Sequence, residues 1–250
     1  MLNRIQHTLI GTQRTPMGNL QLGAFLAAVA GAINAGGFLA VQQYTSHMTG
    51  ILSTMADSIV LGHLNLVWSS LAALVSFMLG GMLCTVLIHF ARKRRLHSEF
   101  AIPLAIEAFL LLIFGLLGAQ IDDFDEFAIP LTAALLCFMM GLQNALISKI
   151  SKSEIRSTHL TGIVTDISIE LGRLFYINRT HRELAPHVQA NKPKLNMLCV
   201  LLLCFFVGAI AGAFGFKQYG YITTLPIALL LVIPSCTLIY QDLFQHSKAK

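Results

Sequence analysis

Six long segments, almost free of charged side chains, constrain what this chain can fold into. A helix crosses about 30 Å of hydrocarbon with roughly 20 residues, because each residue lengthens it by about 1.5 Å. All six segments are long enough, and Glu107 is the only Asp, Glu, Lys or Arg among them. They cover residues 19–43, 64–91, 100–121, 127–148, 195–216 and 218–241. The sequence therefore predicts an all-α polytopic membrane protein with six transmembrane helices.

The composition agrees with this prediction and excludes a soluble globular enzyme. Hydrophobic residues make up 55% of the chain and charged residues 12%, whereas about 25% of the residues in a soluble domain are charged. A chain with so few charges cannot cover its own surface with polar groups, so we expect lipid to cover part of it. The five cysteines all lie in apolar stretches and contain no CxxC pair, which predicts no disulfide framework.

The positions of the basic residues predict the orientation. If the amino terminus is cytoplasmic, 16 of the 17 Lys and Arg residues fall on the cytoplasmic side, and only Lys217 falls outside. The acidic run at 122–126 then also lies outside. Because cytoplasmic loops carry an excess of Lys and Arg, both tails, 1–18 and 242–250, are predicted to be cytoplasmic. The expected partner of the basic residues is a bilayer with anionic headgroups, and not a nucleic acid.

Short motifs recur in the same order in the two halves of the chain. They are Gly-Ala-Ile-Asn-Ala at 31–35 and Gly-Leu-Gln-Asn-Ala at 141–145, Ser-His-Met-Thr-Gly-Ile at 46–51 and Thr-His-Leu-Thr-Gly-Ile at 158–163, and Phe-x-x-Gly at 77–80 and 205–208. Three matches in one order predict a duplication, with repeats at 19–121 and 127–241. Three crossings bring the chain to the opposite side, so the two repeats must be inverted, as in many secondary transporters.

A short amphipathic helix is predicted after each Thr-Gly. From Ile51 and from Ile163, apolar and polar side chains fall on opposite faces at 100° per residue. About 13 residues give a helix of about 20 Å, which is too short to span a bilayer. Each helix is therefore expected to lie at the interface or to enter the membrane as a re-entrant half-helix.

Residues 141–145 and the run Thr161 to Asp166 resemble the YoaK family, as do Met48-Thr49-Gly50 and the glycine-rich first span. The resemblance covers roughly residues 18 to 241. Members are predicted bacterial inner-membrane proteins whose defining domain has no established function. The resemblance therefore implies a multi-pass protein of the inner membrane, and no substrate. The chain departs from the family pattern where Asn34 replaces an Asp and Ile51 replaces an Asn.

The repeated motifs supply the candidate substrate site. Its residues are Asn34, His47, Thr49, Gly50, Asn144, His159, Thr161 and Gly162. Two helix starts that approach the midplane from opposite sides would present positive dipole ends to a small anion or carboxylate. The alternative is that the two threonines act only as helix N-caps. The two asparagines either bond a neighbouring helix or, beside Gly36 and Gly37, line a locally unwound helix.

Proton or ion coupling has its own candidates in Asp57, Glu107 and Asp166. Glu107 is either an intramembrane proton carrier or a carboxylate that reaches the headgroups or the basic run at 92–95. The two aspartates lie on the polar faces of the short helices, facing water or a cavity. The two motif histidines are further candidates for proton coupling, but no third metal ligand accompanies them, so neither a metal site nor a cofactor is expected.

Three functions follow, of which a small-molecule or ion transporter or permease is favoured. The alternative is a non-transporting scaffold that binds a partner through the cytoplasmic loop 149–194. An enzyme that uses His47 or His159 is the weakest, because no nucleophile or metal constellation accompanies them. Gly208-x-x-x-Gly212 and the small residues around Gly80 suit close helix packing, within the chain or in a homodimer.

Overall fold

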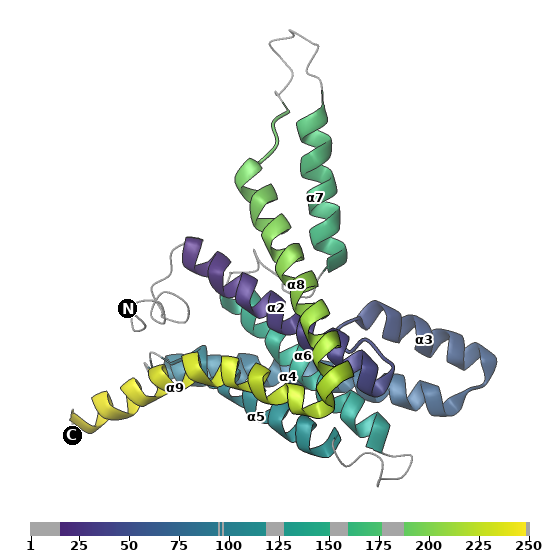
Figure 1. The fold of residues 1–250 in the computed structure, drawn as a ribbon, viewed down its shortest axis with the longest axis horizontal. Helices are drawn as coiled ribbons and strands as arrows, with labels where there is room; N and C mark the ends of the chain where they lie inside the picture. Colours follow the sequence, from purple (N-terminus) through teal and green to yellow (C-terminus); the bar gives the residue numbers. More distant parts are fainter. Residues whose placement is uncertain are drawn as a thin grey trace.

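The computed structural model describes residues 16–94, 96, 98–118, 128–150, 160–176 and 188–248, and every regular element in these ranges is a helix. The elements are α2 (Pro16–Val41), α3 (Met48–Leu61), α4 (Leu64–Lys93), α5 (Ala101–Gly118), α6 (Ala128–Ile150), α7 (Leu160–Phe175), α8 (Lys192–Tyr219), the 3-10 turn η2 (Gly220–Thr223) and α9 (Thr224–Lys248). Figure 1 shows a central group of long helices, from which α3 with the start of α4, and α7 with the start of α8, project in different directions.

Within the part of the chain that the structure describes, five helical stretches are long and apolar enough to cross a membrane. They are 20–39, 64–93, 101–118, 130–150 and 192–233. The last is 42 residues long and runs through α8, η2 and the first part of α9. Each of the six apolar segments of the sequence is thus helical over most of its length, and the all-α polytopic class is confirmed.

Glycine allows α2 and α8 to cross at close range. Gly31 of α2 lies against the backbone of Phe205, and Gly208 of α8 lies against the backbone of Ala28. A Cβ atom at either glycine would overlap the carbonyl oxygen of the facing residue. Helices that pack in lipid approach closely where small residues meet, because backbone atoms then come into van der Waals contact.

The crossing of α4 and α6 is built in the same way. Gly80 of α4 lies against the backbone of Phe138, and Gly141 of α6 lies against that of Phe77. Phe77-x-x-Gly80 corresponds to the motif at 205–208, and Gly141 corresponds to Gly31. The two crossings therefore use matching residues of the duplicated motifs, and each joins a helix of the first half to one of the second.

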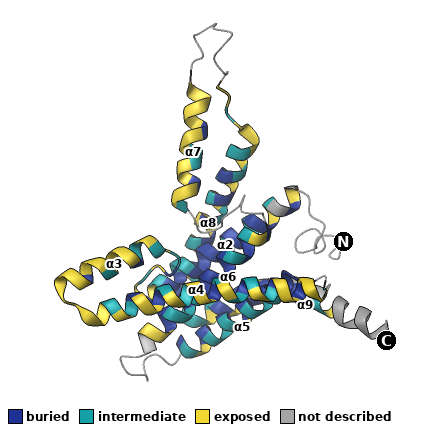
Figure 2. Cartoon of the chain, turned by 180° about the vertical axis from the view of Figure 1, so that it is seen from behind, coloured by how far each residue is buried: buried dark blue, intermediate teal, exposed yellow. Residues whose placement is uncertain are grey.

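The remaining helices pack around these two pairs. α3 packs on α4, α7 on α8, and α5 on α9. Gly115 and Gly118 of α5 receive the side chains of Thr224 and Tyr221. The buried core fills the space between the long helices, whereas exposed residues dominate α3, α7 and the outer faces of α4 and α8 (Figure 2). Many of these exposed residues are large and apolar, as expected for surfaces that face lipid.

Two local expectations were wrong. α2 continues without a break through Gly36 and Gly37, which are buried against the ring of Phe216 and the side chain of Leu136. These glycines allow close packing of α2 on its neighbours, and the helix does not unwind here to expose its carbonyl groups.

The threonines of the Thr-Gly motifs are not N-caps. α3 begins at Met48, so the cap position belongs to His47, whose side chain makes no capping hydrogen bond. α7 begins at Leu160, which places Thr161 inside the first turn as well. Met48 and Leu160, which precede the two motif threonines, are already helical and partly buried. Both threonine hydroxyls thus remain free of a capping role.

Candidate functional site

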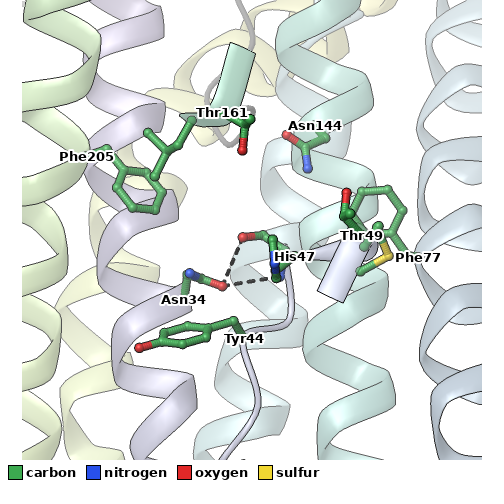
Figure 3. Close-up of a pocket in the computed structure, with 11 residues that line it drawn as sticks. Asn34, Tyr44, His47, Thr49, Phe77, Asn144, Thr161 and Phe205 are labelled. Carbon is green, nitrogen blue, oxygen red and sulfur yellow. Dashed lines mark hydrogen bonds between the residues drawn. The ribbon is translucent and has the colours of Figure 1, made fainter. Parts of the chain in front are cut away.

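A cavity of about 570 Å³ lies where the motifs of the two halves meet (Figure 3). α2, α4, α6 and α8 form its walls, together with the segment before α3 and the first turns of α3 and α7. Its lining consists of Asn34, Tyr44, Ser46, His47, Met48, Thr49, Phe77, Asn144, Leu160, Thr161 and Phe205. Five of the eight residues that the sequence proposed for a substrate site are therefore brought together.

Most of the lining occurs in matched pairs. Residues at equivalent motif positions face the same space, namely Asn34 with Asn144, Met48 with Leu160, Thr49 with Thr161, and Phe77 with Phe205. Figure 3 shows the two threonines beside the starts of α3 and α7, with both asparagines directed into the space between the helices. His47 lines the cavity too, while its counterpart His159 lies outside the described residues.

Asn34 holds the segment that precedes α3. Its Oδ1 accepts a hydrogen bond from the Ser46 backbone N–H at 3.2 Å and another from the Ser46 hydroxyl at 3.0 Å. Nearby, the rings of Phe38 and Tyr44 stack with their centroids 4.4 Å apart. Asn34 therefore bonds a loop of its own half, and not a neighbouring helix as one alternative expected.

Asn144 occupies the matching place on α6 but is more deeply buried, at 7% exposure. Gly141 lies one helical turn before it and packs against α4, which brings this face of α6 to the edge of the cavity. The preceding residue, Gln143, donates a hydrogen bond from Nε2 to the carbonyl oxygen of Leu26 at 3.3 Å, which ties α6 to α2. The position of Asn144 is thus fixed by contacts on both sides.

The glycines of the two Thr-Gly motifs do not line this cavity. A Cβ atom at Gly50 would overlap the ring of His47, so the absence of a side chain there lets the imidazole lie over the start of α3. Gly50 lines a second, neighbouring cavity. Gly162 is exposed, with open space where a Cβ atom would be. The motif glycines therefore have different surroundings.

The cavity combines polar groups with apolar side chains. None of its described lining residues is Asp, Glu, Lys or Arg, and the polar groups are amides, hydroxyls and one imidazole. The first turn of α3 and the first described turn of α7 both face the cavity, and the start of a helix carries a partial positive charge. In the described ranges, no three His, Cys, Asp or Glu side chains are placed to hold a metal ion. The arrangement can bind a small polar or anionic solute.

The coupling candidates lie outside this lining. Asp57 is exposed on α3, and Asp166 pairs with Lys194 at 3.0 Å, with both side chains nearly half exposed. Glu107 is fully buried in α5, and neither of its carboxyl oxygens has a hydrogen-bond partner among the described residues. The expected pairing of Glu107 with the basic run fails where the structure describes it, because Arg92 bonds Glu99 at 2.6 Å instead.

Part of the cavity lining was not predicted from the sequence. Tyr44 lies outside the recurring motifs, and Ser46 belongs to the motif at 46–51 but was not proposed as a site residue. Phe77 and Phe205 were noted only as markers of the duplication. Their recurrence one turn before a packing glycine was the available signal. Glu170 was also overlooked as a structural residue: it bonds Arg173 at 2.8 Å and accepts from the backbone N–H of Asn191 at 2.8 Å, joining α7 to the start of α8.

Comparisons with known proteins agree with the membrane class. The family model described as "Protein of unknown function (DUF1275)" matches residues 22–237. The chain is 29% identical over 215 residues to the UPF0700 transmembrane protein YoaK of Bacillus subtilis (strain 168), an alignment that covers 84% of this chain and 90% of the relative. No solved structure matches the chain. With its several apolar helices and its similarity to YoaK, this chain is a multi-pass membrane protein that belongs to the DUF1275 family.

Proposed function

We propose that this protein is a small secondary transporter or permease of the inner membrane, and that the 570 Å³ cavity is its substrate site. The observation that carries the proposal is the pairing of the lining: four pairs of residues from equivalent motifs face one space. Transporters built from inverted repeats bind their substrates at the interface between the repeats. A cavity of several hundred Å³ is also the usual size of a small-molecule site.

The helix packing supports six spans in two inverted repeats. If each helix is replaced by its counterpart in the other half of the chain, the α2–α8 crossing becomes the α6–α4 crossing. The α5–α9 pair is unchanged by this exchange. A two-fold axis in the membrane plane would produce this pattern. The distribution of Lys and Arg supports cytoplasmic termini, and with them an outer position for the end of α2 and the start of α4.

The proposed substrate is a small carboxylate or another small anion. The first turns of two helices meet at the cavity, where their N–H groups favour negative charge. No acidic side chain in the described lining repels an anion. Thr49 and Thr161 add hydroxyl donors, and Phe77 and Phe205 provide apolar contact for a short carbon chain.

Coupling to protons or another ion is assigned to Glu107. An ionisable side chain that is buried within a membrane helix without a partner is a functional candidate by default. Asp166 forms an ion pair with Lys194, and Asp57 is exposed, so both residues fit the role of a coupling carboxylate less well. The proposal assigns no catalytic residue.

Uptake of labelled acetate, lactate and succinate into proteoliposomes tests the proposed function. Thr49→Val and Thr161→Val each remove one hydroxyl from the cavity while keeping the shape of the side chain. We expect each to weaken the uptake affinity about tenfold, the effect of one lost hydrogen bond to a charged solute.

Thr165→Val is the matched control for that experiment. The Thr165 hydroxyl bonds the carbonyl oxygen of Thr161 within α7 at 2.8 Å and is absent from the cavity lining. We expect its uptake to equal that of the wild type. Failure of the wild-type protein to take up any of these anions, or equal loss in all three variants, would overturn the assignment of this site.

A non-transporting scaffold is the second candidate. It is favoured by α7, which lies within the 149–194 segment and exposes Leu171, Leu174 and Phe175. Phe175 is 76% exposed, which is unusual for an aromatic residue without a partner or lipid around it. Loss of a bound protein from the full-length Phe175→Ser variant, with wild-type uptake absent, would favour this function over transport.

A further inference from the structure

A second cavity of about 630 Å³ lies beside the first. The end of α2, the first half of α3 and the starts of α4 and α6 enclose it. All these parts belong to the side of the molecule that the basic residues assign to the outside. Tyr44 and His47 line both cavities, so the wall between the two spaces is the segment 42–47.

This segment is folded back on α2 in a defined way. Gln42 has a φ of 55°, a left-handed conformation that side chains other than glycine rarely adopt, and it reverses the chain at the end of the helix. Its N–H bonds the carbonyl oxygen of Phe38 at 2.8 Å. Tyr44 then stacks on Phe38, with an angle of 17° between the two rings.

One side chain completes the attachment. Both donors of Ser46, its N–H and its hydroxyl, converge on Oδ1 of Asn34, at 3.2 and 3.0 Å. A carboxylate is a stronger acceptor than an amide oxygen, because hydrogen bonds to a charged acceptor are roughly twice as strong as neutral ones. A carboxylate that reaches Ser46 therefore competes directly with Asn34 for the same two donors.

The second cavity suits the same kind of solute as the first. Its polar lining includes Gln43, Thr54, Asn65 and Ser69, and no described lining residue is Asp, Glu, Lys or Arg. The first turn of α3 borders this cavity as well, through His47 and Gly50. A small anion thus meets similar hydrogen-bonding groups on both sides of the segment.

We propose that the second cavity is an outer binding site for the transported carboxylate, and that residues 42–47 are the gate between it and the central cavity. The Asn34–Ser46 pair is the latch of this gate, and the carboxylate releases it by taking over the two Ser46 donors. The inference rests on the proposed function for the identity of the solute, whereas the gate itself rests on the two cavities and their shared wall.

Thiol labelling tests the gate without any transport measurement. Single cysteines are placed in the second cavity (Ser69→Cys) or in the central one (Thr161→Cys), in a full-length protein whose five native cysteines are replaced by alanine. An impermeant anionic thiol reagent is added to membrane vesicles from the outer side. We expect Ser69→Cys to react readily and Thr161→Cys to react slowly.

Removal of the latch is expected to change only the central site. Asn34→Leu deletes the acceptor at similar volume, and Thr161→Cys should then react about tenfold faster, as expected for the loss of two hydrogen bonds. Ser46→Ala removes one of the two bonds and should give an intermediate rate. Asn196→Leu, the same substitution at an exposed asparagine of α8 that lines neither cavity, should leave the rate unchanged.

Sodium acetate tests the role of the carboxylate. At equal concentration, acetate but not chloride should speed the labelling of Thr161→Cys in the latched protein, with no further effect in Asn34→Leu. An unreactive Ser69→Cys, or an equal rate of Thr161→Cys with and without the latch, would overturn the gate.

The two proposals can fail separately. Faster labelling of Thr161→Cys in Asn34→Leu, in a protein that takes up no carboxylate, would retain the gate and reject the carboxylate as its solute. Carboxylate uptake with unchanged labelling would retain the transporter and reject the gate.

Discussion

At the scale of single residues, burial without a partner sets Glu107 apart. Three other acidic side chains of the described ranges carry ion pairs: Glu99 with Arg92, Glu170 with Arg173, and Asp166 with Lys194. Glu107 is fully buried, yet neither oxygen is hydrogen-bonded within the described part of the chain. A polar group that is buried in this way has lost its hydration without forming a compensating hydrogen bond, so it lowers the stability of the folded protein.

Replacement of Glu107 by leucine should therefore stabilise the protein. We expect Glu107→Leu to raise the free energy of unfolding by about 1–3 kcal/mol, the cost of an unsatisfied buried polar group. Thermal unfolding in detergent measures the change. Glu170→Leu is the contrasting variant: it removes a carboxylate bonded to Arg173 and Asn191, and it should lower the stability.

The same variant separates stability from transport. If Glu107 carries the coupling proton, Glu107→Leu loses uptake driven by a pH gradient although the protein is more stable, as is common where function requires an unfavourable group. A variant that is more stable and still transports at the wild-type rate would remove Glu107 from the coupling mechanism.

At the scale of helices, the two close crossings decide how the molecule is held together. Each places a glycine of one helix against the backbone of the other, at Gly31 and Gly208 between α2 and α8, and at Gly80 and Gly141 between α4 and α6. A methyl group at any of these positions has no space unless the helices separate. The packing of both pairs along their length would then be weakened together.

Alanine substitutions at matching glycines should have matching effects. We expect Gly80→Ala and Gly208→Ala each to lower the free energy of unfolding by about 1–3 kcal/mol, the usual cost of overpacking. Gly172→Ala, in open space on α7, is the control and should stabilise the protein by up to about 1 kcal/mol through helix propensity. Thermal unfolding of the three variants in one detergent compares them. A neutral Gly80→Ala beside a costly Gly208→Ala would show that the crossings are not equivalent.

The helices illustrate what the sequence can and cannot predict. Apolar length identified the long helices, and the phase after each Thr-Gly identified α3 and α7. Neither pattern showed that Gly36 and Gly37 serve close packing. Phe216 and Leu136, which fill the space beside these glycines, belong to helices that are distant in the sequence. For the same reason the repeated motifs predicted Asn34, Asn144 and the two threonines of the cavity, but not Tyr44, whose place depends on the reversal at Gln42.

At the scale of the whole molecule, orientation in the membrane decides which cavity faces which compartment. Lys192 and Lys217 lie near opposite ends of α8, and both side chains are exposed. Of the two, only Lys217 belongs to the side that the excess of basic residues assigns to the outside. The second cavity lies on the side of Lys217, so the orientation also decides from which side the proposed solute would enter it.

Cysteine labelling at the two ends of α8 tests this orientation. In a background without native cysteines, Lys217→Cys should react with an impermeant maleimide on intact cells. Lys192→Cys should react only after the membrane is opened, because it faces the cytoplasm in the proposed orientation. The reverse pattern would show that the molecule has the opposite orientation in the membrane, with the second cavity on the cytoplasmic side.

The glycine crossings also have a consequence for how the protein is made. α2 is among the first helices to enter the membrane, yet the helix that closes on Gly31 is α8, which the ribosome produces near the end of synthesis. The α4–α6 crossing can form earlier, while Gly31 still lacks the helix that packs on it. A chain interrupted after α6 keeps that face open, and we expect it to be removed by membrane proteases. We therefore expect the newborn protein to become resistant to degradation once α8 is complete.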